Sequence, residues 1–570
     1  MKTRARILGT LTAFLLLATS AAGTVLPAQA AASGLEPITL SFGYVEGTSN
    51  NVGIVDGEIL KAIAEATGVT LDLRPYSVEK YKMLVAGGDL PDIATALESH
   101  VSGVTQQLIE AGAIIPLDDL LDKYGQHLKA NIPLALKWAK DVQGNGVTYT
   151  LPTGCTKADT SSPDPYGDFT FEMRWDIYEA IGSPEIKSDE DFLKVAKMMQ
   201  DYCPVSPEGY KVYAFSGFIT NGPLWQYKLS WPRAHGSYWA PVFHQIDMFT
   251  GELESMYTKE DSYLWKSLEF HNKAYQMGLF DPEALTMTFE QYDEKLQTGQ
   301  VLFAAFQQRA VNQTLIPGGL FAKHPGITPY IHKLYPMGNP LGNQAGHARV
   351  ISSNCKYPER AMQLLDFLDS PEGVRLLLNG VKGKHWDVVD GVPQYIGEFA
   401  EAFKAGKGKE YYAQVLGMDY DAIFSFFSGN IAETGDEYPA DLRLTPAFYA
   451  LFADEAARNW AKKFDPGFTY RGQVYEKWYK EGLVTTAADI PLAVNMMGAL
   501  SAESTNVQAK IDSYFGQNLG KVLLAKDDAE FQKNKQELIA EFYAMGAADS
   551  DAEVQKLFQQ AEALVASLDQ

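Results

Sequence analysis

Apolar and polar positions between residues 38 and 97 follow two alternating periods. Val69, Leu71 and Leu73 are spaced two residues apart, which is typical of a strand, whereas the apolar residues of segment 56–67 share one helix face. The predicted elements are strands over residues 38–45, 69–73 and 93–97 and helices over residues 56–67 and 78–86. This order predicts a parallel sheet whose strands are joined by right-handed helical crossovers.

The end of the first predicted strand is a candidate binding site. Ligands of open α/β sheets bind beyond the carboxyl ends of the strands. Tyr44 occupies that end, and Glu46 begins the loop that follows. Both residues are therefore predicted ligand contacts, and a purely structural role is the alternative for each.

Turn signals divide the rest of the chain. Gly144-Asn145-Gly146 predicts a hairpin over residues 141–151, and the run rich in Pro, Gly, Ser and Asp from Pro152 to Gly167 predicts a boundary between two lobes. Three further elements are predicted: a strand over residues 347–352, a helix over residues 359–369, and a hairpin from Trp386 to Tyr395 that turns at Asp390-Gly391. The C-terminal part of the chain is predicted to be mostly helical.

Residues 1–30 have the pattern of a secretory signal peptide. Lys2, Arg4 and Arg6 precede a short apolar stretch over residues 7–22, and Ala28-Gln29-Ala30 provides small residues for cleavage. We therefore expect cleavage near Ala30 and export from the cytoplasm. A single N-terminal transmembrane helix is the alternative, and no later stretch approaches the roughly 20 apolar residues that a membrane span requires.

The charge and cysteine content limit the possible partners. The formal net charge is −23, and removal of residues 1–30 makes it more negative because that segment holds three basic residues and no acidic one. A chain of this charge would repel nucleic acid. The three cysteines, Cys155, Cys203 and Cys355, allow one disulfide at most, and none has metal-ligand spacing. No cysteine lies near the cleavage site, so no lipid-anchor cysteine is expected.

Five short motifs follow one another between residues 87 and 391. They are GGDLPDI at 87–93, GAIIPLDDLL at 112–121, MRWD at 173–176 leading to Gly182, PERAMQLLDFLDSPEG at 358–373, and GKHW at 383–386 leading to Gly391. In these motifs and their order, the chain resembles the extracellular solute-binding proteins of carbohydrate ABC transporters, the group of the maltose-binding protein. The last two motifs resemble the long branch of that group, which is associated with oligosaccharides. The C-terminal third resembles the group only in length and helicity.

The resemblance implies an α/β fold of the two-lobed periplasmic-binding-protein type, with hinge strands and a ligand cleft between the lobes. Residues 35–152 and 345–430 would form the first lobe, and residues 153–344 and 431–570 the second. The implied function is capture of a carbohydrate, such as an oligosaccharide, outside the cytoplasm and its delivery to the permease subunits of an ABC importer. The chain would act as a monomer, with no cofactor. No metal is expected either, because the segment between Gly182 and Phe192 is short for the calcium loop of some relatives.

Carbohydrate sites combine aromatic rings, which stack on the apolar faces of sugars, with carboxylates, amides and Arg, which bind the hydroxyl groups. Segment 225–239 is rich in such residues, and we predict that it lines the cleft from the second lobe through Trp225, Trp231, Trp239 and Arg233. An aromatic-rich corner of the core is the alternative.

The matched motifs add three further candidate residues. Trp386 lies in the predicted hairpin, where the resemblance implies an aromatic side chain that faces the cleft. Arg174 and Asp176 belong to the third motif. Packing within the hairpin is the alternative for Trp386, and an ion pair within the lobe is the alternative for Arg174 and Asp176.

Two other classes of protein remain possible from the sequence. A secreted polysaccharide-degrading enzyme would need two carboxylates across the scissile bond, and the 71 acidic residues do not exclude such a pair. A binder of peptides or other non-sugar solutes would share the same fold. No nucleophile elbow, His-Glu-x-x-His motif or Walker loop occurs, so no catalytic residue is predicted.

Overall fold

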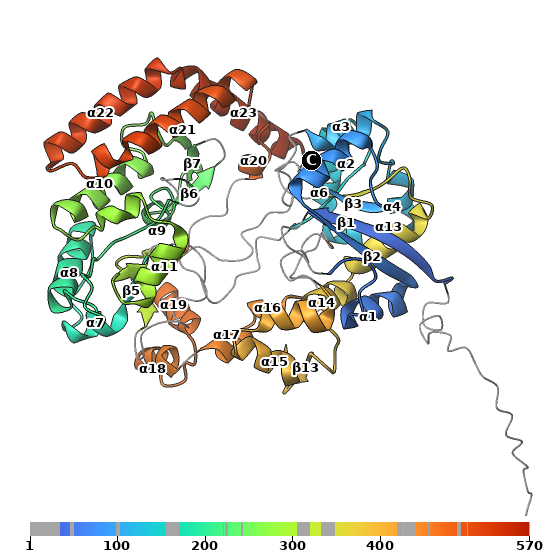
Figure 1. The fold of residues 1–570 in the computed structure, drawn as a ribbon, viewed down its shortest axis with the longest axis horizontal. Coiled ribbons are helices and arrows are strands. Elements are labelled where there is room, and N and C mark those ends of the chain that lie inside the picture. Colours follow the sequence, from blue (N-terminus) through green and yellow to red (C-terminus); the bar gives the residue numbers. More distant parts are fainter. Residues whose placement is uncertain are drawn as a thin grey trace, which may run out of the picture.

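The chain folds into two lobes that face each other across the middle of the molecule (Figure 1). The computed structural model describes residues 35–45, 51–97, 103–155, 170–219, 222, 226–240, 243–304, 320–331, 348–418, 426, 440–453, 455–486, 492–498 and 500–568. The predicted signal peptide and the candidate residues Glu46 and Trp225 lie outside the described residues. Among the described helices, none has the length and apolarity that would allow it to cross a bilayer.

The first lobe is built on a five-stranded sheet in the order β2-β1-β3-β12-β4. Its strands are β1 (Ile38–Val45), β2 (Val69–Tyr76), β3 (Ile93–Ala96), β4 (Leu151–Pro152) and β12 (Ala348–Ile351). Strand β1 pairs in parallel with both β2 and β3, and helices α1 (Glu58–Thr67) and α2 (Val78–Gly87) connect them. The predicted parallel sheet and its two crossover helices are therefore confirmed.

Helices cover both faces of this sheet. Leu40 and Phe42 of β1 pack with α1, whereas Ala94 and Ala96 of β3 pack with α2 on the opposite face. The other helices of the lobe are α3 (Val104–Glu110), α4 (Asp118–Tyr124), α5 (Gln126–Asn131), α6 (Pro133–Trp138), α13 (Pro358–Leu368), α14 (Pro371–Asn379), α15 (Gly397–Lys404), α16 (Gly408–Tyr411) and α17 (Pro446–Phe452).

One predicted hairpin forms and the other does not. Strands β13 (Trp386–Val389) and β14 (Val392–Tyr395) pair around Asp390 and Gly391, both of which have positive φ, as predicted. The hairpin predicted over residues 141–151 is wrong. Residues Ala139–Gln143 continue α6 as a π-helical turn, and the chain reverses from Gly144 to Val147 without strands on both sides.

The second lobe has smaller sheets and more helix. Its sheets are β10-β5-β9, β6-β7-β8 and β11-β15. The strands are β5 (Glu172–Arg174), β6 (Ser237–Ala240), β7 (His244–Asp247), β8 (Leu253–Ser255), β9 (Phe303–Ala304), β10 (Phe321–Ala322), β11 (Tyr330–Ile331) and β15 (Thr485–Thr486). The helices of this lobe that precede strand β12 in the sequence are α7 (Trp175–Ala180), α8 (Asp189–Tyr202), α9 (Ser230–Ala234), α10 (Tyr263–Gln276) and α11 (Phe289–Gln297).

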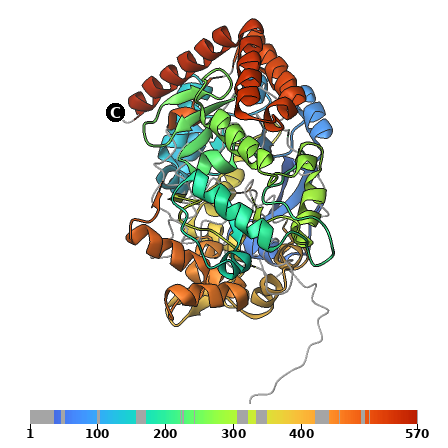
Figure 2. The same ribbon diagram turned by 90° about the vertical axis from the view of Figure 1, so that its left-hand side faces the viewer.

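The C-terminal part of the chain is mostly helical, as predicted. Its helices are α18 (Glu455–Phe464), α19 (Arg471–Lys480), α20 (Leu492–Asn495), α21 (Ala502–Leu523), α22 (Asp528–Ala544) and α23 (Ala547–Leu568). The long helices near the C-terminus lie along one edge of the molecule, red in Figure 2. Helix α21 packs against α10, which ties these helices to the second lobe.

Two large apolar clusters mark the lobes. The first-lobe cluster extends to Leu442, and Phe448 and Leu451 of α17 pack against it. The second-lobe cluster resumes at Ala453. Tyr449 and Ala450 of the same helix pack against the second-lobe cluster, so α17 contacts both lobes. The start of the second lobe at residue 431 stays a prediction.

A buried ion pair fixes the strand with which the chain re-enters the first lobe. Arg349 of β12 donates a 2.6 Å hydrogen bond to Asp369, and both side chains are fully buried. The same guanidinium group donates to the Phe426 carbonyl oxygen at 2.9 Å. Arg349 thus holds together β12, the end of α13 and a segment that lies almost 80 residues further along the chain.

We predict that Arg349→Met destabilises the first lobe by about 3–5 kcal/mol, because it leaves the Asp369 carboxylate buried without this cation. Urea unfolding would measure the loss. Arg74→Met is the matched control, since Arg74 forms a partly exposed ion pair with Asp72 and should cost less than about 1 kcal/mol. Equal effects of the two substitutions would contradict a structural role for the buried pair.

Candidate functional site

The junction of β5 and α7 places two side chains at a surface pocket in the second lobe. Strand β5 is the middle strand of its sheet, and Arg174 pairs with Phe321 of β10. The Trp175 amide then donates to the Leu320 carbonyl oxygen at 2.8 Å, and the chain turns directly into α7. Trp175 and Asp176 therefore occupy the first turn of a helix whose start is fixed by the sheet.

Helix α18 forms the opposite wall of the pocket. Its polar residues face outwards, and Trp460 is only 2% exposed. The indole rings of Trp175 and Trp460 meet edge to face, with ring centroids 5.3 Å apart. Trp478 of α19 and Phe464 support Trp460 from behind. The walls therefore consist of two rings that are held in place by aromatic packing.

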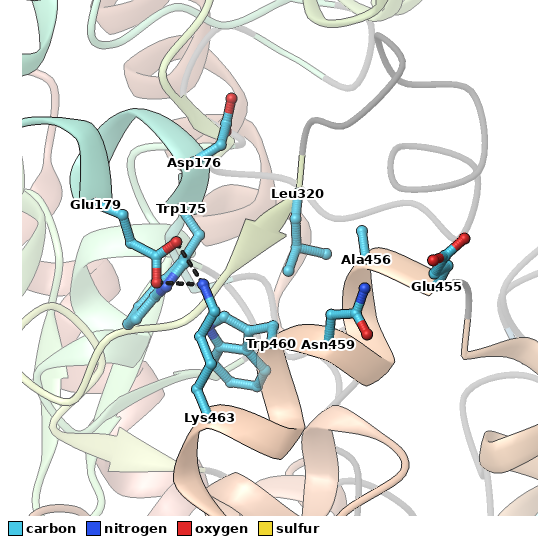
Figure 3. Close-up of a pocket in the computed structure, with 9 residues that line it drawn as sticks. All are labelled: Trp175, Asp176, Glu179, Leu320, Glu455, Ala456, Asn459, Trp460 and Lys463. Carbon is cyan, nitrogen blue, oxygen red and sulfur yellow. Dashed lines mark hydrogen bonds and ion pairs between the residues drawn. The ribbon is translucent and has the colours of Figure 1, made fainter.

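The pocket between these helices has a volume of about 410 Å³. Its lining residues, drawn in Figure 3, are Trp175, Asp176, Glu179, Leu320, Glu455, Ala456, Asn459, Trp460 and Lys463. The rings, Leu320 and Ala456 give an apolar surface, and the other side chains bring charged and amide groups around it.

Two ion pairs organise the charged groups of the pocket. Arg174 binds both carboxylate oxygens of Asp176, at 2.9 and 2.6 Å, from beneath the pocket. Lys463 of α18 contacts both oxygens of Glu179 at 2.5 Å and so links the two walls (Figure 3). Glu455 adds a third carboxylate. The pocket is thus lined by more acidic than basic groups.

The two tryptophans also carry unused hydrogen-bond donors. Within the part of the chain that the structure describes, the indole N–H groups of Trp175 and Trp460 have no hydrogen-bond partner, although both are buried. Buried donors are normally paired, and an unpaired one costs about 1–3 kcal/mol.

Neutral groups support Trp175 on its far side. His324 lies 6.1 Å from the Trp175 ring, centroid to centroid, and its Nε2 is 3.1 Å from the Tyr178 hydroxyl group. Burial lowers the pKa of His324 to about 4, so it is uncharged at neutral pH. His324 therefore adds no positive charge behind Trp175.

Most of the predicted aromatic segment is packed into the second lobe. The Trp231 indole N–H donates to Asp189 at 3.1 Å, and its ring stacks on His235 at 3.6 Å. Arg233 is buried, with its guanidinium carbon 4.7 Å from the centre of the Tyr238 ring. These contacts give Trp231 and Arg233 structural partners.

Trp239 differs from the other described residues of this segment. It is 40% exposed on the edge strand β6, and the Lys228 amine lies 5.6 Å from the centre of its ring. Burial lowers the pKa of Lys228. The surface formed by Trp239, Lys228 and Phe243, here called the β6 platform, is the part of the predicted segment that offers an accessible ring.

The first-lobe candidates contact their own lobe. Tyr44 is buried beside Phe426, with ring centroids 5.4 Å apart. Trp386 is 4% exposed, and its indole N–H donates to the Gly380 carbonyl oxygen at 3.0 Å. Arg375 lies 5.4 Å from the centre of the Trp386 ring. Trp386 is therefore buried in the first-lobe core.

Among the candidate residues that the structure describes, only Asp176 lines the pocket, with Arg174 as its ion-pair partner. The residues that the sequence did not indicate are Trp175, Glu179, Leu320, Glu455, Asn459, Trp460 and Lys463. Trp460 lies 285 positions after Trp175, so no local pattern connects them. The only available signal was the single Trp in the apolar stripe of a short amphipathic helix. In the described residues, no cluster of three or more His, Cys, Asp or Glu side chains could hold a metal ion.

Comparison with known proteins identifies the fold. No family model and no curated protein sequence matches the chain. Among solved structures, it is similar to the ABC-transporter substrate-binding protein FusA of Streptococcus pneumoniae in complex with kestose, with 16% identity, a TM-score of 0.54, and coverage of 92% of this chain and 100% of that one.

Two further structures have the same architecture. An HMO-binding, ABC-transporter-associated solute-binding protein from Bifidobacterium longum infantis has 15% identity and a TM-score of 0.56, with coverage of 92% of this chain and 98% of that one. The N-glycan transport solute-binding protein NgtS of Streptococcus pneumoniae has 17% identity and a TM-score of 0.54, with coverage of 92% and 99%. The chain therefore has the two-lobed fold of the extracellular solute-binding proteins, as the sequence motifs indicated.

We predict that acid destabilises the second lobe partly through His324. Its pKa is 6.5 in the reference state and about 4 in the folded protein, so between these values only the unfolded chain takes up the proton. The free energy of unfolding should therefore decrease as the pH is lowered through that window, by at most about 1.4 kcal/mol per pH unit. His324→Gln should flatten the dependence of the urea midpoint between pH 7 and 5. An unchanged slope would contradict the assignment.

Proposed function

We propose that this chain is the substrate-binding component of an ABC importer. It would capture a carbohydrate outside the cytoplasm and deliver it to the permease subunits in the membrane. The fold supports this role, since the similar structures include an ABC-transporter protein in complex with kestose and proteins described as binding HMO or transporting N-glycans. The pattern of residues 1–30 is consistent with export.

The pocket between α7 and α18 is the observation that carries the proposal. It combines the accessible edges of two fixed aromatic rings with Leu320, Ala456, carboxylates and the Asn459 amide. A sugar ring has an apolar C–H face for the apolar lining and hydroxyl groups that both donate to carboxylates and accept from the amide N–H. We therefore propose that this pocket holds one sugar residue of the ligand.

The charges of the pocket favour a neutral sugar. Glu179 is paired with Lys463 and Asp176 with Arg174, so Glu455 leaves an excess of negative charge. A uronate or other acidic sugar would add like charge beside it, whereas hydroxyl groups satisfy the same carboxylates without repulsion. We propose a neutral oligosaccharide as the ligand class.

Capture would proceed without a chemical step. A ligand that contacts both lobes in one arrangement shifts the population towards that arrangement. The second lobe would supply the pocket, and the loops that follow the parallel strands of the first lobe would supply further contacts to a longer ligand.

Substitution of the pocket tryptophans tests the site. Trp460→Phe replaces the indole that forms one pocket wall with a smaller ring, so affinity for a neutral oligosaccharide should fall about five- to tenfold. Trp265→Phe is the matched control, because Trp265 is buried in the same lobe and donates to the Tyr257 carbonyl oxygen. It should change the melting temperature but not the affinity. Titration calorimetry on each variant would measure the difference.

Two outcomes would overturn the assignment. If Trp460→Phe binds like the wild type and Trp239→Ala does not, the site is the β6 platform. If acidic sugars raise the melting temperature and neutral ones do not, the ligand class is wrong, because a ligand that binds only the folded state must stabilise it.

A separate experiment distinguishes the binder from an enzyme and from a peptide receptor. We expect that prolonged incubation of the purified protein with an oligosaccharide that it binds returns the sugar intact, as judged by mass spectrometry. A reaction product that accumulates would establish the enzyme instead. A thermal-shift panel that responds to peptides and not to sugars would establish a peptide receptor.

A further inference from the structure

Helix α6 takes part in two different apolar clusters. Ala135 and Leu136 belong to the core of the first lobe, so the helix is a fixed part of that lobe. Trp138 at its end, with Leu134 one turn earlier, belongs to a separate cluster. In the described part of the chain, the Trp138 indole N–H has no hydrogen-bond partner, so apolar packing holds the ring in place.

Apart from Ala139 next to Trp138, the rest of this cluster comes from the second lobe and the C-terminal helices. Its buried members there are Ala240, Ile246, Met248, Leu253, Ala493, Val494, Met496, Val554, Phe558 and Ala561. Helix α23 contacts α6 directly, and Leu564 and Val565 at its end pack against the same cluster. The cluster therefore joins the two lobes through side chains and not through the backbone.

Helix α23 is firmly attached to the second lobe. Gln555 donates to the Leu253 carbonyl oxygen at 2.8 Å, and Thr258 donates to Asp551. At the start of α21, Ser501 and Ser504 donate to Glu553. The helix thus moves with the second lobe, and its contact with α6 changes whenever the lobes move relative to each other.

We propose that this cluster, here called the clasp, is a releasable second connection between the lobes. Figure 1 shows the end of α23 beside α6 at one side of the molecule, while α17 and α18 connect the lobes at the opposite side. The backbone crossover would act as the hinge, and the clasp would hold the lobes at the separation seen here. Opening exposes Trp138 and Phe558 to water, which opposes opening because their apolar surface is buried in the clasp.

The clasp also predicts control of ligand affinity from a distant position. This consequence rests on the proposed function, since it requires a ligand that contacts both lobes. Apparent affinity is reduced by the fraction of molecules that are not in the binding arrangement. Weakening the clasp would therefore lower affinity without any change in the pocket.

Small-angle X-ray scattering of the ligand-free full chain tests the clasp directly. Trp138→Ala removes the first-lobe side chain, and Leu564→Lys places a charge at the edge of the clasp with less risk to folding. Both should increase the radius of gyration and leave far-ultraviolet circular dichroism unchanged. Lys137→Ala on α6 and Gln560→Ala on α23 are matched controls on exposed positions and should scatter like the wild type.

The outcomes separate this proposal from the proposed function. If both clasp variants are folded and scatter like the wild type, the clasp is wrong whatever the protein binds. If they expand and an identified oligosaccharide binds at least threefold more weakly, the clasp and its link to affinity are supported. If they expand and no sugar binds the wild type, the clasp stands and the proposed function fails.

Discussion

The return of the chain to the first lobe depends on one buried ion pair. Strand β12 joins the first-lobe sheet after the chain has built much of the second lobe, and it is antiparallel to its neighbour β3. Arg349 and Asp369, both fully buried, fix that strand against α13. A misplaced β12 would leave two charges buried without partners, which costs far more than an apolar mismatch. Arg349 also donates to the Phe426 carbonyl oxygen, so the same anchor holds a later part of the chain against this strand.

Local sequence patterns predicted the first lobe well because its elements repeat a simple period. The strand and helix periods between residues 38 and 97 survive into the structure since each element packs one face on the same sheet. The two hairpins show the limit of this reasoning. Asp390-Gly391 lies between residues that pair as strands, whereas Gly144-Asn145-Gly146 follows a helix that continues through Gln143. A turn signal specifies a reversal of the chain but not the elements that it connects.

The candidate site was largely hidden from the sequence for a different physical reason. An aromatic side chain lowers the free energy by burial in a core and by stacking on a ligand, so composition alone does not separate the two roles. Trp231 and Trp239 lie in one segment, yet one donates to Asp189 in the lobe and the other is exposed. Trp386 matched a motif and is buried in the first-lobe core, where its indole N–H donates to the Gly380 carbonyl oxygen. The pocket itself needs Trp175 and Trp460, which only the tertiary fold brings together.

Ligand entry and the clasp have opposite effects on the separation of the lobes. Under the proposed function the ligand contacts both lobes, so the lobes must separate for an oligosaccharide to enter and leave. The clasp resists separation, since Trp138 and Phe558 lose their shared apolar surroundings when α6 and α23 part. If the clasp stabilised the lobe separation seen here by about 1.4 kcal/mol relative to an opened arrangement, it would change the population ratio of these two arrangements tenfold. A contact of that strength is small enough to break thermally and large enough to set affinity. The few apolar side chains that α6 contributes are consistent with such a contact, and a full interlobe core would not be.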